Sequence, residues 1–186
     1  IGGHAFAQVW ADGRLHGLNA SGRAPAAWNP GSFKGLDAIP ARGWDSVTVP
    51  GQVSGWVALS KRFGALPFAD LFTDAIRHAR DGFPVSPVIA QQWAQSVRDL
   101  HMYPGFEAFM PRGRAPAVGE IWRFADQADT LADIAATRGE SFYRGRLAQA
   151  QSAVTGPGGG GDHQIKGVGR SVQGVDGRPG VFEGGD

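Results

Sequence analysis

Cysteine is absent from the 186 residues of the chain, which excludes disulfide scaffolds, thiolate metal sites and cysteine nucleophiles. An excess of positive charge is also missing, since 18 lysines and arginines stand against 17 aspartates and glutamates. Proteins dedicated to nucleic acids carry a basic excess, so we expect no nucleic-acid partner. No run approaches the ~18 consecutive apolar residues of a membrane-spanning helix, and we therefore expect no membrane partner either.

Glycine is plentiful but unevenly distributed. Of 29 glycines, 12 lie between Gly156 and Gly185, where large apolar residues are nearly lacking. This shift predicts a folded segment over residues 1–154 and a disordered glycine-rich tail over 155–186, for which a frameshift is one hypothesis. Because the chain begins with Ile1 and shows no basic-then-apolar leader, we expect its true start to lie upstream, and the compartment (periplasmic, secreted or cytoplasmic) stays open.

The first 20 residues predict a β-hairpin. Residues 5–10 and 15–19 are extended in character, and Asp12-Gly13 between them is a strong turn signal because glycine accepts positive φ. A two-stranded hairpin is marginal in water and needs further strands. Only residues 46–49 suggest one.

From Gly51 onward the apolar period becomes helical. Gly82 and Gly139 are expected to end helices, and Ser86-Pro87 to begin one. Gly55 inside a helix predicts the close approach of another element, and the aromatic pair Phe142-Tyr143 is expected to anchor the last helix. The predicted helices are 52–63, 68–81, 87–100, 126–138 and 140–153.

No metal or cofactor site is predicted. No two of the five histidines are spaced i, i+4, and none has an aspartate or glutamate partner at ligand spacing, so surface or capping roles are expected for them. The six tryptophans lie mostly at core-like positions, and a stacking platform would also need a basic groove.

Several segments in one order resemble the large subunit of the γ-glutamyltransferase family, also called glutathione hydrolases, with its cephalosporin-acylase-like relatives. The likeness covers about residues 1–150. The matching segments are residues 2–6 (GGHAF), 49–56 (VPGQVSGW), 66–68 (LPF), 75–76 (AI), 81–86 (DGFPVS), 119–120 (GE) and 139–145 (GESFYRG).

The resemblance implies an N-terminal-nucleophile hydrolase without a cofactor. In such enzymes the precursor cleaves itself, and the new terminal threonine of the small subunit attacks a γ-glutamyl or related acyl amide while its own amine serves as general base. None of the five threonines here lies in a Thr-Thr-His-like cleavage context. We therefore expect no catalytic residue in this chain, no activity without the small subunit, and that subunit as its partner.

The resemblance also implies one substrate contact from the large subunit, an arginine of an R-E-x-A-P motif that pairs with the substrate carboxylate. In this chain Ala24-Pro25 match, Ser21 stands at the arginine's position and Gly22 at the glutamate's, with Arg23 two residues later. Ser21 and Arg23 are the candidate substrate-binding residues. Since a bidentate guanidinium clamp depends on angle, the shift puts γ-glutamyl specificity in question, and a solvated loop arginine is the alternative for Arg23.

The predicted fold class is α+β: an incomplete part of an αββα sandwich, mostly helical, with an amino-terminal β-hairpin. The favoured function is that of an inactive part of a γ-glutamyltransferase-family amidohydrolase or acyltransferase. The alternative is a non-catalytic helical binding or scaffold module, or a pseudogene product.

Overall fold

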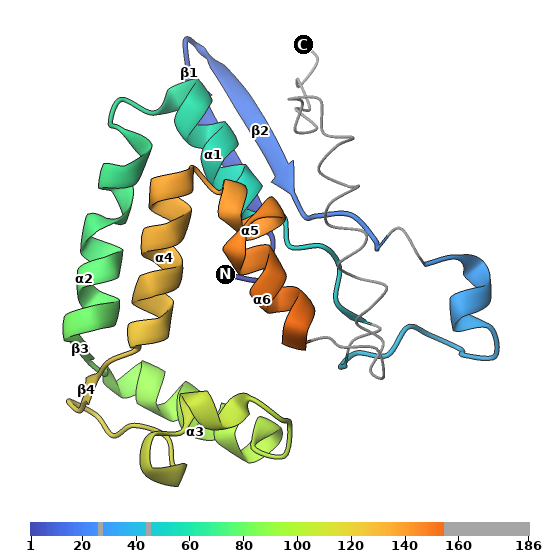
Figure 1. The fold of residues 1–186 in the computed structure, drawn as a ribbon, viewed down its shortest axis with the longest axis vertical. Coiled ribbons are helices and arrows are strands. Elements are labelled where there is room, and N and C mark those ends of the chain that lie inside the picture. Colours follow the sequence, from blue (N-terminus) through green and yellow to red (C-terminus); the bar gives the residue numbers. More distant parts are fainter. Residues whose placement is uncertain (26–27, 44–45, 155–186) are drawn as a thin grey trace. The chain divides into compact units, whose positions relative to one another are not determined.

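The computed structural model describes residues 1–25, 28–43 and 46–154, and the predicted tail 155–186 lies outside them. The described chain forms two compact units, residues 1–71 with those from 133 on, and residues 72–132. The predicted α+β class is confirmed, with a hairpin first and helices after it (Figure 1).

The hairpin consists of β1 (Ala5–Ala11) and β2 (Arg14–Ala20) in antiparallel register. Its two-residue turn places Asp12 at φ 52° and Gly13 at φ 76°, the positive angles that match the strand twist. One face of the hairpin carries Ala7, Val9 and Leu18 and lies against α1 (Gln52–Phe63) (Figure 1).

The other face of the hairpin is apolar and open. Phe6, Trp10 and Leu15 are 69%, 71% and 52% exposed, and Trp10 stands directly opposite Leu15 in the register. The expectation of mostly core-like tryptophans is thus wrong for Trp10. Alternation along the strand turns its side chain away from α1.

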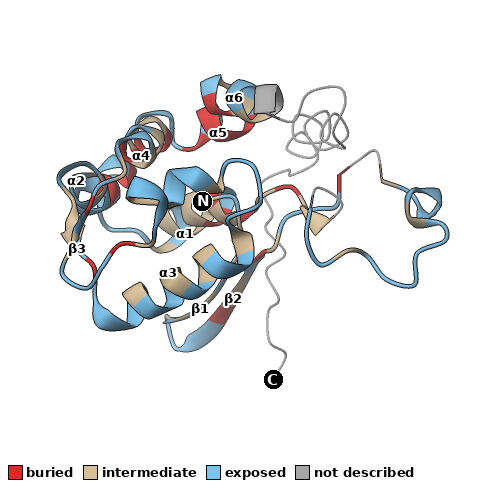
Figure 2. Cartoon of the chain, turned by 90° about the horizontal axis from the view of Figure 1, so that it is seen from below, coloured by how far each residue is buried: buried red, intermediate tan, exposed pale blue. Residues whose placement is uncertain are grey.

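The remaining helices of the first unit are the last turn of α4 (Ala125–Thr137), α5 (Glu140–Arg144) and α6 (Arg146–Val154). Gly139, at φ 82°, separates α4 from α5 as predicted. Gly145 divides the single helix that we expected over 140–153, because its backbone leaves the helical region and a Cβ there would meet the Cα of Ser141 at 2.8 Å. Buried residues cover most of α5 (Figure 2).

The second unit contains α2 (Thr73–Asp81), β3 (Phe83–Pro84), α3 (Pro87–Leu100) and β4 (Ile121–Trp122). Gly82 ends α2 at φ 95°, and the Ser86 hydroxyl accepts the Ile89 N–H at 3.4 Å as the N-cap of α3, both as predicted. The helix expected over 68–81 instead begins with the tighter 3-10 helix Phe68–Phe72, a frequent form of a helix start. Short 3-10 helices also occupy Phe106–Phe109 and Pro111–Gly113 in this unit, and Pro30–Phe33 in the first unit.

The strand expected at residues 46–49 is wrong. Val49 donates one backbone hydrogen bond to the Arg23 carbonyl, and Pro50 has no N–H with which to extend a ladder. The second two-stranded sheet is formed by β3 and β4, which the sequence did not suggest.

Candidate functional site

The candidate substrate-binding residues share one loop at the end of β2. Ser21 is half-buried, and its N–H donates to Asn19 Oδ1 at 2.9 Å. Arg23 is exposed, while its carbonyl accepts the Val49 N–H at 2.9 Å. Among the described residues no carboxylate pairs with the guanidinium of Arg23. The loop therefore holds the backbone of Arg23 in place and leaves its side chain open to a ligand.

Glycines let this loop pack backbone to backbone against the start of α1. A Cβ on Gly22, whose φ is 75°, would lie 1.8 Å from the Val49 oxygen. On Gly51 it would lie 2.3 Å from the Ala20 oxygen, and on Gly55 2.8 Å from the Ala20 Cβ. The predicted close approach at Gly55 is thereby confirmed, and residues 20–23 and 49–51 form one tight seam.

Helix α1 begins without a side-chain cap. Its N-cap is Gly51, and the first backbone N–H groups of a helix have no partner within it. The Gln52 N–H donates to the Gly3 carbonyl at 3.1 Å. The Ser54 N–H donates to the hydroxyl of Tyr143 at 3.0 Å, a residue 89 positions away in the chain.

Tyr143 is bonded on both sides of its hydroxyl. The O–H donates to the Pro50 carbonyl at 2.8 Å, while the oxygen accepts from Ser54. Burial raises the pKa of the Tyr143 phenol, an effect that the hydrogen bond from Ser54 partly offsets. The expected anchoring role of Phe142 and Tyr143 is confirmed, since both side chains are buried.

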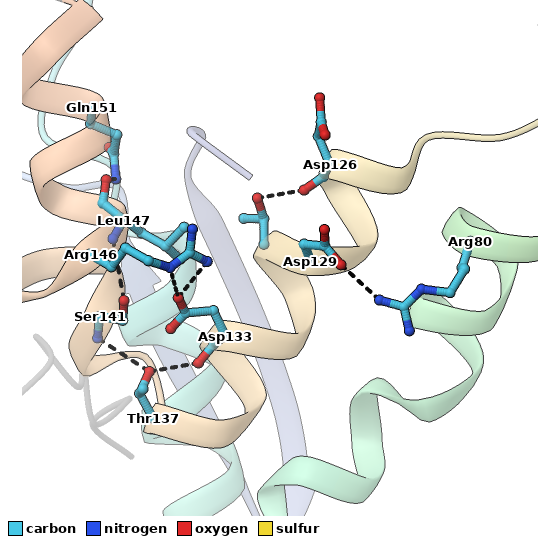
Figure 3. A network of polar contacts seen from close by, with 10 residues as sticks. Arg80, Asp126, Asp129, Asp133, Thr137, Ser141, Arg146, Leu147 and Gln151 are labelled. Atoms are coloured by element: carbon cyan, nitrogen blue, oxygen red, sulfur yellow. Dashed lines mark hydrogen bonds and ion pairs between the residues drawn. The ribbon is translucent and has the colours of Figure 1, made fainter.

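A polar network fixes α5, on which Tyr143 lies (Figure 3). The carboxylate of Asp133 accepts from Arg146 Nε at 2.8 Å and from its Nη2 at 2.6 Å. The Thr137 hydroxyl donates to the Asp133 carbonyl at 2.7 Å and accepts the Ser141 N–H at 3.2 Å. Ser141 Oγ accepts the Leu147 N–H at 3.3 Å, so both ends of this short helix are held.

A hydroxyl and an imidazole also meet near the start of the chain. Thr48 Oγ1 lies 3.4 Å from Nε2 of His4, which is exposed. A nucleophile–base pair requires a third group that orients the base, and within the described residues no carboxylate bonds to His4. This pair therefore does not form a catalytic triad.

A small apolar pocket of about 30 Å³ lies between the hairpin and the carboxyl end of α1. Neither Ser21 nor Arg23 is among the residues that line it. His16 lines it and is buried, contrary to the surface role expected for the histidines. Its Nδ1 accepts from Arg62 at 2.9 Å, so Nε2 carries the hydrogen, and Nε2 has no partner within the described part of the chain. The pocket has room for little more than a water molecule.

The second unit contains a charged turn of its own. The Glu120 carboxylate accepts the Ala117 N–H at 2.9 Å and Arg114 Nη1 at 2.9 Å, with Arg112 3.8 Å away. The Ala117 N–H and then Arg114 hold the pKa of Glu120 below its ordinary value. Because all its oxygens face these partners, we interpret Glu120 as a structural residue of the turn.

Across residues 1–25, 28–43 and 46–154, no group of three or more histidines, aspartates or glutamates is placed to hold a metal ion. The described helices include none with the length and hydropathy needed to cross a bilayer. Sequence reasoning missed two features of the site: the bonds of the Tyr143 hydroxyl and the burial of His16. The GESFYRG segment marked Tyr143 as an anchor, but nothing in it indicates a partner near residue 50.

Residues 1–161 match the protein family described as Gamma-glutamyltranspeptidase. The chain is 39% identical over 133 residues to the glutathione hydrolase-like YwrD proenzyme of Bacillus subtilis, which covers 70% of this chain and 25% of that protein. It is 38% identical over 171 residues to the oxamate amidohydrolase proenzyme of Klebsiella pneumoniae, a match that covers 84% of this chain and 32% of that protein. The chain thus spans about a quarter to a third of the length of these curated relatives.

Two solved structures, an acylase and a γ-glutamyltranspeptidase, are also similar to this chain. A cephalosporin acylase from Bacillus halodurans superposes with a TM-score of 0.82 at 41% identity, over 91% of this chain and 33% of that one. The γ-glutamyltranspeptidase of Helicobacter pylori superposes with a TM-score of 0.81 at 24% identity, over 90% and 50%, and shows the shared fold.

Proposed function

The chain belongs to the gamma-glutamyltranspeptidase family, and we propose that it forms the amino-terminal part of the large subunit of an amidohydrolase or acyltransferase. The family resemblance is confirmed, and so is the α+β class with an amino-terminal hairpin. The relatives named above are proenzymes. The proposed substrate is a γ-glutamyl or related acyl amide, and the partner is the small subunit of the same precursor.

In this proposal the attacking group comes from the small subunit. A terminal threonine carries its hydroxyl and its own amine as general base, so both reacting groups arrive together on the partner. The residues of the present chain bind and orient the substrate. Domain organisation follows the same division, with residues 1–154 as the folded part of the large subunit.

The observation that carries the proposal is the seam that fixes the loop of Ser21 and Arg23. A carboxylate clamp requires a guanidinium on a backbone that does not move, because its two parallel hydrogen bonds depend on angle. The Arg23 carbonyl is bonded to Val49, and Gly22 and Gly51 leave no space between the loop and α1. Arg23 is proposed to pair with the substrate carboxylate and Ser21 to donate its hydroxyl beside it.

The open hairpin face supports the proposed partner. Phe6, Trp10 and Leu15 form an apolar patch that α1 does not cover. An isolated two-stranded sheet is marginal, and exposed apolar faces of this kind usually mark an interface. The small subunit is the proposed occupant, since the curated relatives are three to four times as long as the matched segment.

The test is Arg23→Ala in the complete processed enzyme, with hydrolysis of a γ-glutamyl anilide as the assay. Loss of a charged hydrogen bond of about 1.5–3 kcal/mol predicts a KM roughly 10 to 100 times higher with kcat little changed. Arg42→Ala, at another exposed arginine, is the matched control and should change neither constant. Equal KM values for both variants would assign Arg23 to the solvated loop arginines.

A further inference from the structure

We propose that Tyr143 is a positioning residue for the substrate loop: through its hydroxyl it fixes residues 49–51, and through them it sets the conformation of residues 21–23. This inference rests on the proposed function of Ser21 and Arg23. The juxtaposition that carries it is a phenol from α5 bonded both to Pro50, the residue before the N-cap of α1, and to Ser54, the third residue of that helix.

Helix α1 lacks the usual side-chain cap at its start. Helices usually satisfy their third N–H with the side chain of the N-cap residue, a serine, threonine, aspartate or asparagine. Here the N-cap is Gly51, and a side chain is excluded because its Cβ would lie 2.3 Å from the Ala20 oxygen and 2.6 Å from the Gly22 nitrogen. The close packing that seats the loop thus removes the ordinary cap, and the bond that replaces it must come from elsewhere.

The Tyr143 hydroxyl supplies that bond. It accepts the N–H of Ser54, the third residue of α1, at 3.0 Å and donates to the Pro50 carbonyl at 2.8 Å. One oxygen therefore holds the backbone on both sides of Gly51. The Tyr143 ring is buried and both of its hydrogen bonds are partly buried, so loss of the hydroxyl leaves the Ser54 N–H and the Pro50 carbonyl without this partner.

Val49 connects this clamp to the substrate loop. Val49, immediately before Pro50, donates its N–H to the Arg23 carbonyl at 2.9 Å. Its own carbonyl lies 1.8 Å from where a Cβ on Gly22 would stand. A shift of the 49–51 backbone by a few tenths of an ångström therefore moves Gly22 and Arg23 with it, because no space separates them.

Tyr143 is itself held in place by the contacts of α5. Its neighbours in α5 are held by Ser141, which bonds to Thr137 and Leu147, and by the Asp133–Arg146 pair (Figure 3). Gly139 packs against Val53 of α1, since a Cβ there would lie 2.9 Å from Val53 Cγ1. The ring is thus fixed independently of its hydroxyl, and removing the oxygen alone tests the clamp.

The experiment compares Tyr143→Phe with Tyr103→Phe, the same change at the other tyrosine of the chain, in the complete processed enzyme. We expect Tyr143→Phe to raise KM for a γ-glutamyl anilide about 3- to 10-fold with kcat within 2-fold, because the loop binds substrate and does not react with it. Tyr103→Phe should change neither. A Tyr143→Phe enzyme that loses thermal stability with an unchanged KM would show a purely structural anchor and overturn the proposal.

Amide hydrogen exchange gives a second readout that needs no substrate. In Tyr143→Phe, the amides of Ser54 and Val49 should exchange at least tenfold faster, whereas Ala90 in α3 should be unchanged. In the unmodified protein, the amides of Ser54 and Val49 should be protected from exchange to a similar degree. This measurement tests the clamp even if the Tyr143→Phe variant does not fold. Unprotected Ser54 in the unmodified protein would contradict the clamp.

The outcomes separate this inference from the proposed function. Faster exchange at Val49 together with a KM that is insensitive to Arg23→Ala would uphold the clamp and reject Arg23 as the substrate contact. A KM that responds to Arg23→Ala but not to Tyr143→Phe would reject the clamp and uphold the proposed function.

Discussion

Gly22 faces the Val49 carbonyl so closely that a Cβ would stand 1.8 Å from the oxygen. Two demands meet at this glycine: a backbone φ of 75° and the absence of any side chain. The position separates the two candidate substrate-binding residues, so the same contact that closes the seam also sets the spacing between Ser21 and Arg23.

Gly22→Ala should destabilise the fold far more than Gly13→Ala. Both glycines have nearly the same φ, 75° and 76°, but nothing lies within 4 Å of a Cβ on Gly13. Gly13→Ala should therefore cost only the backbone strain of roughly 1–2 kcal/mol, and Gly22→Ala that strain plus the displacement of residues 49–51. Urea unfolding of the two variants measures the difference, and equal losses would mean that the seam is loose.

Alkaline pH should destabilise the protein through Tyr143. Burial raises the pKa of its phenol above 10.0, so its contribution to stability is fully present below the unfolded value near pH 10 and is lost as the pH rises through the folded value. Thermal midpoints should therefore fall more steeply above pH 10 in the unmodified protein than in Tyr143→Phe. Parallel curves for the two proteins would show that the phenol is solvated.

Acid pH should destabilise the turn at Glu120. The Ala117 N–H and Arg114 lower the pKa of this carboxyl, so its stabilising contribution is present above the ordinary value of 4.5 and is lost as the pH falls through the lower folded value. Glu120→Gln should lower the thermal midpoint at pH 7, and its difference from the unmodified protein should shrink as the pH falls below 4.5. Glu107→Gln, at an exposed glutamate outside this cluster, is the control and should change little at either pH.

Ile134→Ala should be among the most destabilising single truncations in the first unit. Its side chain is fully buried, and truncation of a buried isoleucine removes about 2–5 kcal/mol by lost burial and a residual cavity. Ile39→Ala makes the same change at a residue that is 56% exposed and should stay within about 0.5 kcal/mol. Similar unfolding free energies for both variants would place Ile134 outside the core.

Local signals predicted the elements well because their causes are local. Asp12-Gly13 specifies its turn, Ser86 caps α3, and Gly139 ends α4 by its positive φ. The prediction of a single helix over 140–153 was wrong. The helix breaks at Gly145, which packs closely on Ser141. Periodicity does not record such a contact.

Contacts between residues far apart in the chain could not be predicted from the sequence for the same reason. Tyr143 reaches Pro50 across 93 positions, and no residue near position 50 indicates that a phenol will replace its cap. His16 is buried because Val9 stands opposite it in the hairpin and Phe63 packs 5.2 Å from its ring, neither of which a lone histidine predicts. Ser21 and Arg23 were named from a motif, and the structure adds the seam that holds them.

The central claim, that this chain frames a substrate site and depends on a partner for its nucleophile, is tested most directly by hydrolysis of a γ-glutamyl anilide. The chain alone should release the aniline at the background rate, and the same chain produced together with the small subunit of its precursor should release it catalytically. Turnover by the chain alone, above background, would contradict the account.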